Sequence, residues 1–87
     1  MSRETLLQFP AEFPIKVMGR QDAGLLAVTQ PIVERHAGSL SAASIRQRAS
    51  SDGNFLAITF IVQATSQQQL DAIYTELSAC EAVLMAL

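Results

Sequence analysis

The chain has 87 residues and a formal net charge of −2; 49% of its residues are hydrophobic and 16% are charged. This length allows one domain with a single modest core, and the negative charge disfavours a nucleic-acid surface. The single cysteine excludes an intramolecular disulfide. No apolar run approaches the roughly 18 residues of a transmembrane helix, and the N-terminus has no signal-peptide core. We therefore expect a cytoplasmic protein that binds neither membrane nor nucleic acid.

The first segment of the chain, residues 1–12, is expected to be an arm that precedes the domain. Pro10 and Pro14 lie close together and disfavour a helix there. Residues 13–87 then make up the single domain. Its first element is predicted to be a strand over residues 13–18, because every second side chain is a large apolar one.

Residues 22–36 are predicted to form the first helix. Asp22 is a suitable N-cap, and Gly38 lies just past the end, where a left-handed cap favours glycine. Pro31 removes one backbone N–H group, but the apolar periodicity continues through it, so we expect one kinked helix rather than two. The buried stripe of this helix is expected to contain Leu25, Val28 and Ile32.

The middle of the chain is predicted to be a hairpin, with a strand over residues 40–49, a turn over 50–53 and a strand over 54–65. An Asp-Gly pair is the strongest signal for the turn. The first strand ends in polar side chains that include Arg46 and Arg48, which suits the solvated edge of a sheet. The second strand is apolar on both faces, as is typical of a central strand.

Residues 66–79 are predicted to form a second helix, in which Ser66 and Gln69 match a capping box. Residues 81–87 are predicted to form the last strand. The resulting order, βαββαβ, is the ferredoxin-like pattern of an α+β sandwich. Right-handed crossovers put both helices on one face of a four-stranded antiparallel sheet with the order 4-1-3-2.

The sheet face away from the helices is the candidate partner-binding face. Alternation assigns six side chains to it: Lys16, Met18, Ala57, Thr59, Ile61 and Leu84. Val83 and Met85 are expected on the opposite face, beneath the helices. The apolar members of the open face would form a patch that favours association with a protein partner or a second copy. The alternative is that the arm folds over this face through Leu6, Leu7 and Phe9.

Catalytic and metal-binding side chains are scarce. The sole histidine, His36, is expected to cap carbonyls at the end of its helix rather than act as a base. Cys80 has no second histidine to activate it and is expected to be an inert, half-buried residue. One cysteine and one histidine do not supply the four ligands of a structural zinc site. We therefore expect no enzymatic activity, no metal and no cofactor.

Four short motifs occur along the chain, at residues 13–19, 34–37, 50–55 and 83–87. In this order and spacing they resemble the YbeD-like family of small bacterial proteins of uncharacterised function. The resemblance implies a ferredoxin-like fold similar to ACT regulatory domains, which bind amino acids or other small effectors at subunit interfaces. It implies no catalytic residues. Members of the family are often encoded near lipoate-attachment genes, which implies a metabolic setting.

The resemblance to ACT domains makes the connection after the first strand a candidate ligand loop, formed by Gly19, Arg20, Gln21 and Asp22. Glycines beside a helix start can present backbone N–H groups to an anion. The loop lacks the lysine and hydroxyl residue of a P-loop, so a simple strand end is the favoured interpretation. Two functions remain. The first is a non-enzymatic regulatory or protein-interaction domain that acts through its open sheet face. The alternative is an ACT-like sensor that binds an amino acid or lipoyl-related metabolite at this loop or at a subunit interface.

Overall fold

Two ten-residue strands, β1 (Ala11–Arg20) and β3 (Phe55–Ala64), form the centre of the sheet in the computed structural model, which describes residues 8–87. They pair antiparallel along their whole length. The shorter strands β2 (Ile45–Ala49) and β4 (Val83–Ala86) lie at the edges, giving the order β2-β3-β1-β4. This is the predicted order 4-1-3-2 read from the opposite edge, and the ferredoxin-like α+β arrangement is confirmed.

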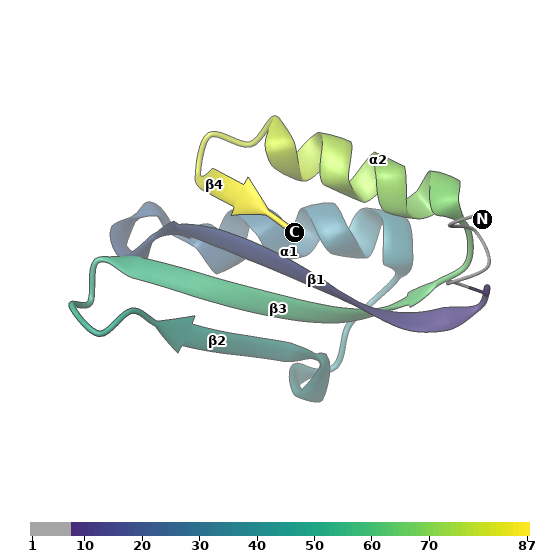
Figure 1. Ribbon diagram of the computed structural model, residues 1–87, viewed down its shortest axis with the longest axis horizontal. Helices are drawn as coiled ribbons and strands as arrows, with labels where there is room; N and C mark the ends of the chain where they lie inside the picture. Colours follow the sequence, from purple (N-terminus) through teal and green to yellow (C-terminus); the bar gives the residue numbers. More distant parts are fainter. Residues whose placement is uncertain (1–7) are drawn as a thin grey trace, which may run out of the picture.

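Two helices, α1 (Leu25–Ala37) and α2 (Gln67–Ser78), cover one face of the sheet (Figure 1). The first continues through Pro31, so the prediction of one helix rather than two is confirmed. It ends at Gly38, whose φ of 83° is in the left-handed region and whose N–H donates to the carbonyl oxygen of Glu34 at 2.9 Å. Both helices therefore pack on the same side and leave the other sheet face uncovered by helices.

The start of α1 differs from the prediction. Gln21–Ala23 form a short 3₁₀ helix, and Gly24, with a φ of 65°, is the N-cap of α1. Asp22 lies inside the 3₁₀ helix and therefore does not cap α1. The backbone enters α1 at Gly24 in a left-handed conformation, which glycine adopts without a steric penalty. An N-cap at Asp22 would not give the backbone this conformation.

The core lies between the sheet and the two helices. Its buried apolar side chains are Ile15, Val17, Leu25, Ile32, Val33, Ile58, Phe60, Val62, Ala64, Leu70, Ile73 and Leu77. Val28, predicted to be buried, is 40% exposed, and Thr29 is buried in its place. The Thr29 hydroxyl donates to the carbonyl oxygen of Leu25 at 2.7 Å, so the buried oxygen is satisfied within the helix.

The hairpin between β2 and β3 has the predicted turn but a shorter first strand. Gly53 has a φ of 77° and donates its N–H to the carbonyl oxygen of Ser50 at 3.0 Å. Ala42–Ser44, predicted to belong to the strand, form a 3₁₀ helix instead. Ile45 is consequently the first residue of β2, and it pairs with Phe60. The part of β3 beyond Phe60 pairs with β1 alone.

Strand β4 contains a register shift that changes which of its side chains face the helices. Met18 pairs with Met85 but Gly19 pairs with Val83, so Leu84 is an extra residue without a partner in β1. A bulge of this kind interrupts the alternation of faces. Val83 packs against the core, whereas Met85 is 50% exposed and lies on the same face as Met18. The prediction that the helices cover Met85 is therefore wrong.

The N-terminal segment enters the sheet earlier than predicted. Strand β1 begins at Ala11, within the segment expected to be an arm. Phe9 packs against the buried core instead of the open sheet face. Leu6 and Leu7, the other side chains of the alternative in which the arm covers that face, lie outside the described residues. Neither helix in the described part of the chain is long and apolar enough to span a membrane.

Candidate functional site

The sheet surface opposite the helices, called here the open face, is built from alternate residues of all four strands. Directly opposed residues of antiparallel strands place their side chains on the same face, so the register defines rows across the sheet. One row contains Arg46, Thr59, Lys16 and Leu87. The next row contains Arg48, Ala57, Met18 and Met85. Residues from distant parts of the sequence are thereby brought together.

Most of the predicted partner-binding residues lie on the two central strands of this face. The register places Lys16 and Met18 of β1 beside Ala57, Thr59 and Ile61 of β3. The sixth predicted residue, Leu84, lies at the bulge of β4 and is 61% exposed.

Sequence reasoning missed two apolar side chains of the open face, Met85 and Leu87, which are 50% and 62% exposed. The two backbone hydrogen bonds between Leu87 and Lys16, of 2.7 and 2.9 Å, extend the pairing of β4 with β1 to this last residue. Alternation alone could not assign Met85, because the bulge shifts the pattern by one residue.

Three cationic side chains gather on the open face. Lys16 lies on β1 and Arg46 on β2, on either side of Thr59, and Arg48 follows two residues further along β2. Neighbouring strands are about 4.8 Å apart and alternate residues about 6.6 Å, so the three Cα atoms lie within roughly 12 Å of one another. Among residues 8–87, no carboxylate is within ion-pairing distance of these three cations. We call Lys16, Arg46 and Arg48 the cationic cluster.

The carboxylates occupy other parts of the molecule. Several lie on or next to the helices, namely Glu34, Asp71, Glu76 and Glu81. On the described part of the open face the exception is Glu12, which pairs with Gln63. It is four positions from Lys16 along β1, a distance of roughly 13 Å along a strand. Positive charge is thus concentrated on the open face of a chain whose net charge is −2.

Two shallow hollows of about 380 and 360 Å³ lie on this face and share Lys16, Arg46 and Thr59. The first hollow extends to the apolar side chains of Ile61 and Leu87. The second extends along β2 beside the cationic cluster. Charged donors, a hydroxyl group and apolar side chains therefore border the same surface, a combination that favours binding to a partner of mixed character.

The candidate ligand loop is occupied largely by contacts within the fold. A Cβ atom on Gly19 would collide with the carbonyl oxygen of Ala82 and lie 2.8 Å from Cδ1 of Leu25. The N–H of Gln21 donates to the carbonyl oxygen of Asn54 at 2.8 Å. The glycine therefore permits close packing, and the Gln21 amide, at the start of the 3₁₀ helix, is already used within the fold.

The two charged residues of this loop are exposed. Arg20 and Asp22 have their nearest charged atoms 3.8 Å apart. Arg20 of β1 pairs with Phe55 of β3, and its guanidinium lies 6.0 Å from the centre of the Phe55 ring. These contacts attach the loop to the end of the sheet.

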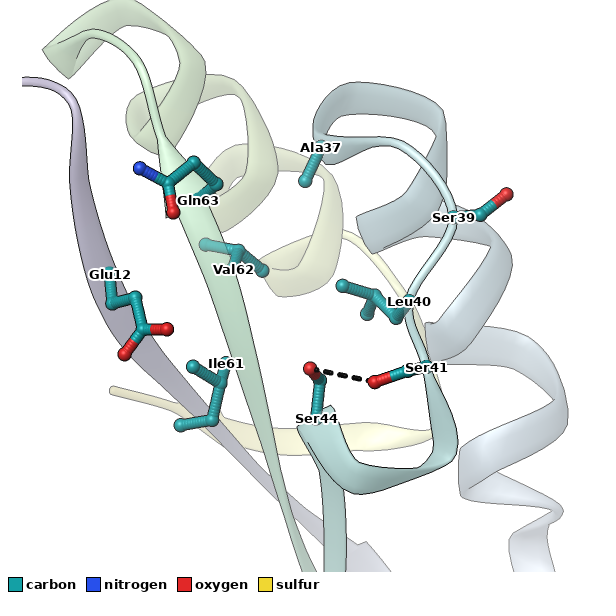
Figure 2. A pocket seen from close by; sticks show the side chains of 9 residues that line it. All are labelled: Glu12, Ala37, Ser39, Leu40, Ser41, Ser44, Ile61, Val62 and Gln63. Carbon is teal, nitrogen blue, oxygen red and sulfur yellow. Dashed lines mark hydrogen bonds between the residues drawn. The ribbon is translucent and has the colours of Figure 1, made fainter.

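A third hollow, of about 290 Å³, lies where β3 extends beyond β2. Figure 2 shows Leu40 directed toward Val62. The hydroxyl groups of Ser41 and Ser44 are hydrogen-bonded, with their oxygen atoms 3.2 Å apart. Its full lining is Glu12, Ala37, Ser39, Leu40, Ser41, Ser44, Ile61, Val62 and Gln63. This lining supplies hydroxyls and one carboxylate but no cation, so it lacks the charge needed to hold an anion.

His36 joins the two helices. Its Nε2 lies 2.7 Å from Oε1 of Glu76 on α2, and the neighbouring Arg35 pairs with the same carboxylate. The hydrogen bond from His36, followed by the contacts of Arg35, lowers the pKa of Glu76. The expectation that His36 caps carbonyls of its own helix is therefore wrong, because a carboxylate on the neighbouring helix is the better acceptor. Cys80 is half-buried and packs against the core.

Comparison with known proteins places the chain in a family. The model of the family described as "Protein of unknown function (DUF493)" matches residues 4–87. A UPF0250 protein of Ralstonia nicotianae is 40% identical over 77 residues, which cover 88% of this chain and 79% of the relative. UPF0250 proteins of Nitrosomonas europaea and Chromobacterium violaceum are 36% identical over 87 residues and 39% identical over 85 residues. These matches cover 100% of both chains in the first case, and 98% of this chain and 96% of the relative in the second. The predicted YbeD-like resemblance is confirmed, and the chain belongs to the DUF493 (UPF0250) family.

Proposed function

We propose that this protein is a non-enzymatic interaction domain that binds a protein partner through its open face. The observation that supports this function is the exposure of Met85 and Leu87 beside Met18, on the sheet face that neither helix covers. Burial of about 300 Å² of apolar surface would contribute roughly 7 kcal/mol before the costs of association. Apolar side chains gathered on one face, next to polar and charged ones, are typical of an interaction surface.

The fold supports this proposal by holding the binding side chains on paired strands. Strands β1 and β3 pair over their entire length, so the backbone beneath Lys16, Met18, Thr59 and Ile61 is fixed before a partner arrives. A preformed surface loses little conformational freedom on binding. The unbranched methionine side chains can still adjust to the shape of the partner.

A sensor of a small metabolite is the weaker proposal. It would place the ligand at the loop of Gly19, Arg20, Gln21 and Asp22, where the glycine and one backbone amide are engaged within the fold. The open face offers larger exposed apolar side chains and three cations that have no ion-pair partner among residues 8–87. We therefore assign the primary binding role to the open face.

Site-specific photo-cross-linking in the native bacterial cytoplasm tests this function. A benzophenone amino acid replaces Met85 on the open face in one variant and Asp71, exposed on α2, in the matched control. We expect a discrete protein adduct from position 85 and none from position 71, with thermal unfolding showing that both variants fold. Identical adducts from the two positions, or no adduct from position 85, would contradict an interaction through the open face.

A further inference from the structure

We propose that the partner presents an acidic segment of protein chain, with its carboxylates on the cationic cluster and its apolar side chains on the neighbouring hollow. This inference rests on the proposed function and specifies the chemistry of the partner. The cluster consists of Lys16, Arg46 and Arg48, and the adjoining apolar wall includes Ile61 and Leu87.

The charge pattern is the first argument. No carboxylate among residues 8–87 lies within ion-pairing distance of the cluster, while Arg35 on α1 does pair with a carboxylate, that of Glu76. Guanidinium groups bind carboxylates in a bidentate geometry, and two of the three cations are arginines. The side chain of Thr59 lies between Lys16 and Arg46 and adds a hydroxyl group that can donate to the same oxygen atoms.

The second argument excludes a second copy of the chain as the favoured occupant. A face-to-face pair related by a two-fold axis brings the same surface of each copy together. The cationic cluster lies in the two rows that also contain the apolar side chains Met18, Met85 and Leu87. Burial of those apolar groups against themselves would therefore bring like charges close together, which disfavours the dimer.

The third argument separates an acidic protein from a nucleic acid. Sheets that bind single-stranded nucleic acids use aromatic side chains on their central strands as stacking platforms. Two of the three aromatic side chains of the central strands, Phe13 and Phe60, pack on or within the helix-side core. The third, Phe55, is on the open face but at the very end of β3, where it lies opposite Arg20. The open face of β1 and β3 between these ends carries aliphatic and polar side chains: Pro14, Lys16, Met18, Ala57, Thr59 and Ile61.

A titration with defined probes tests the inference on the full chain. The main probe is a fluorescent peptide of about ten alternating Glu and Leu residues, roughly 33 Å long when extended. Its matched control replaces every Glu by Lys, and an oligothymidylate of similar length provides anionic charge without apolar side chains. Fluorescence anisotropy measures affinity, and backbone amide NMR shifts locate the bound probe. We expect the acidic peptide alone to shift the amides around Lys16, Arg46 and Thr59, with affinity that falls several-fold between about 50 and 300 mM salt.

Charge-neutralising variants identify the groups responsible. Combined replacement of Lys16, Arg46 and Arg48 by glutamine is expected to weaken binding of the acidic peptide on the order of tenfold or more, since each exposed ion pair contributes roughly two- to fivefold. The control Arg35→Gln removes one cation on the helix side and is expected to leave the affinity unchanged. The single variants Arg46→Gln and Arg48→Gln repeat the test if the combined variant does not fold.

The outcomes separate this inference from the function on which it rests. Equal binding of the acidic peptide by the parent and the combined variant, or tighter binding of the oligothymidylate, overturns the acidic-segment proposal. Absence of peptide binding together with a position-85 protein adduct also overturns it, while the interaction function stands. Absence of both the adduct and peptide binding overturns the two proposals together. Selective binding of the acidic peptide, lost on neutralising the cluster but not on Arg35→Gln, supports the inference.

Discussion

Replacement of Gly19 by alanine is expected to destabilise the domain by about 3 kcal/mol. The new Cβ atom would collide with the carbonyl oxygen of Ala82 and lie 2.8 and 3.3 Å from the two methyl groups of Leu25. Carbon atoms in favourable contact are about 3.5–4.0 Å apart. Leu25 is only 1% exposed and has little room to move. The carbonyl belongs to a turn held by the bond from the Val83 N–H to the Cys80 oxygen at 3.0 Å.

The expected loss of stability follows from the two groups that the new Cβ atom would meet, the carbonyl of Ala82 and the side chain of Leu25. Overpacking usually costs about 1–3 kcal/mol, and the upper end applies because one obstacle is backbone and the other is a buried side chain. For a domain of this size, a loss of about 3 kcal/mol lowers the Tm by roughly 12–24 °C. Urea unfolding followed by circular dichroism measures the free energy, and thermal unfolding measures the Tm.

Gly24→Ala is the matched control for this substitution. Gly24 has a φ of 65° and no neighbouring atom within 4 Å of a Cβ atom, so alanine there should cost about 1 kcal/mol through its left-handed backbone alone. If Gly19→Ala is no more destabilising than Gly24→Ala, the packing argument is refuted. The glycine in the candidate ligand loop would then require another explanation, such as the close approach of a ligand.

The remaining predictions concern the helices. The hydrogen bond from His36, followed by the contacts of Arg35, lowers the pKa of Glu76, so its carboxylate stabilises the fold above the pKa of the unfolded chain. That stabilisation is lost as the pH falls through the lower folded pKa. Urea titrations at about pH 7 and pH 3 should therefore show a smaller difference between the parent and Glu76→Gln at the acidic pH, and a constant difference would contradict this account. Ser66→Ala should lose about 1 kcal/mol, because the hydroxyl accepts the N–H of Gln69 at 3.0 Å. The control Ser78→Ala, at the exposed end of α2, should change stability by less than about 0.5 kcal/mol, and equal losses in urea unfolding would reject the capping role.

The arrangement of the fold could be predicted because the sequence patterns of its elements are local and extend over many consecutive residues. Strand β3 carries apolar residues on both faces over ten positions, which favours a central place in the sheet. Half of the predicted capping box is present: the Ser66 hydroxyl accepts the N–H of Gln69, but the side chain of Gln69 accepts from the N–H of Thr65 rather than from that of Ser66. The bulge at Leu84 was not predictable, because it depends on how β4 fits beside Gly19 rather than on its own residue pattern.

The candidate site was predictable only in part. The turn after β2 fixes the register of the hairpin, so Arg46 opposite Thr59 follows once the turn is located. Lys16 opposite Thr59 does not follow, because β1 and β3 are joined through a helix and their register depends on tertiary packing. The sequence alone therefore indicates only a solvated sheet edge for Arg46 and Arg48, and the pairing of β1 with β3 brings Lys16 close to them.

The central claim, that the open face binds an acidic protein partner, is tested most directly by the cross-linking yield from position 85 with and without the cationic cluster. We expect neutralisation of Lys16, Arg46 and Arg48 to reduce the adduct on the order of tenfold, in proportion to the loss of three ion pairs. The same measurement with Arg35→Gln should leave the yield unchanged. An undiminished adduct in the combined variant would contradict the role of charge, and an equal adduct from position 71 would contradict the open face as the binding surface.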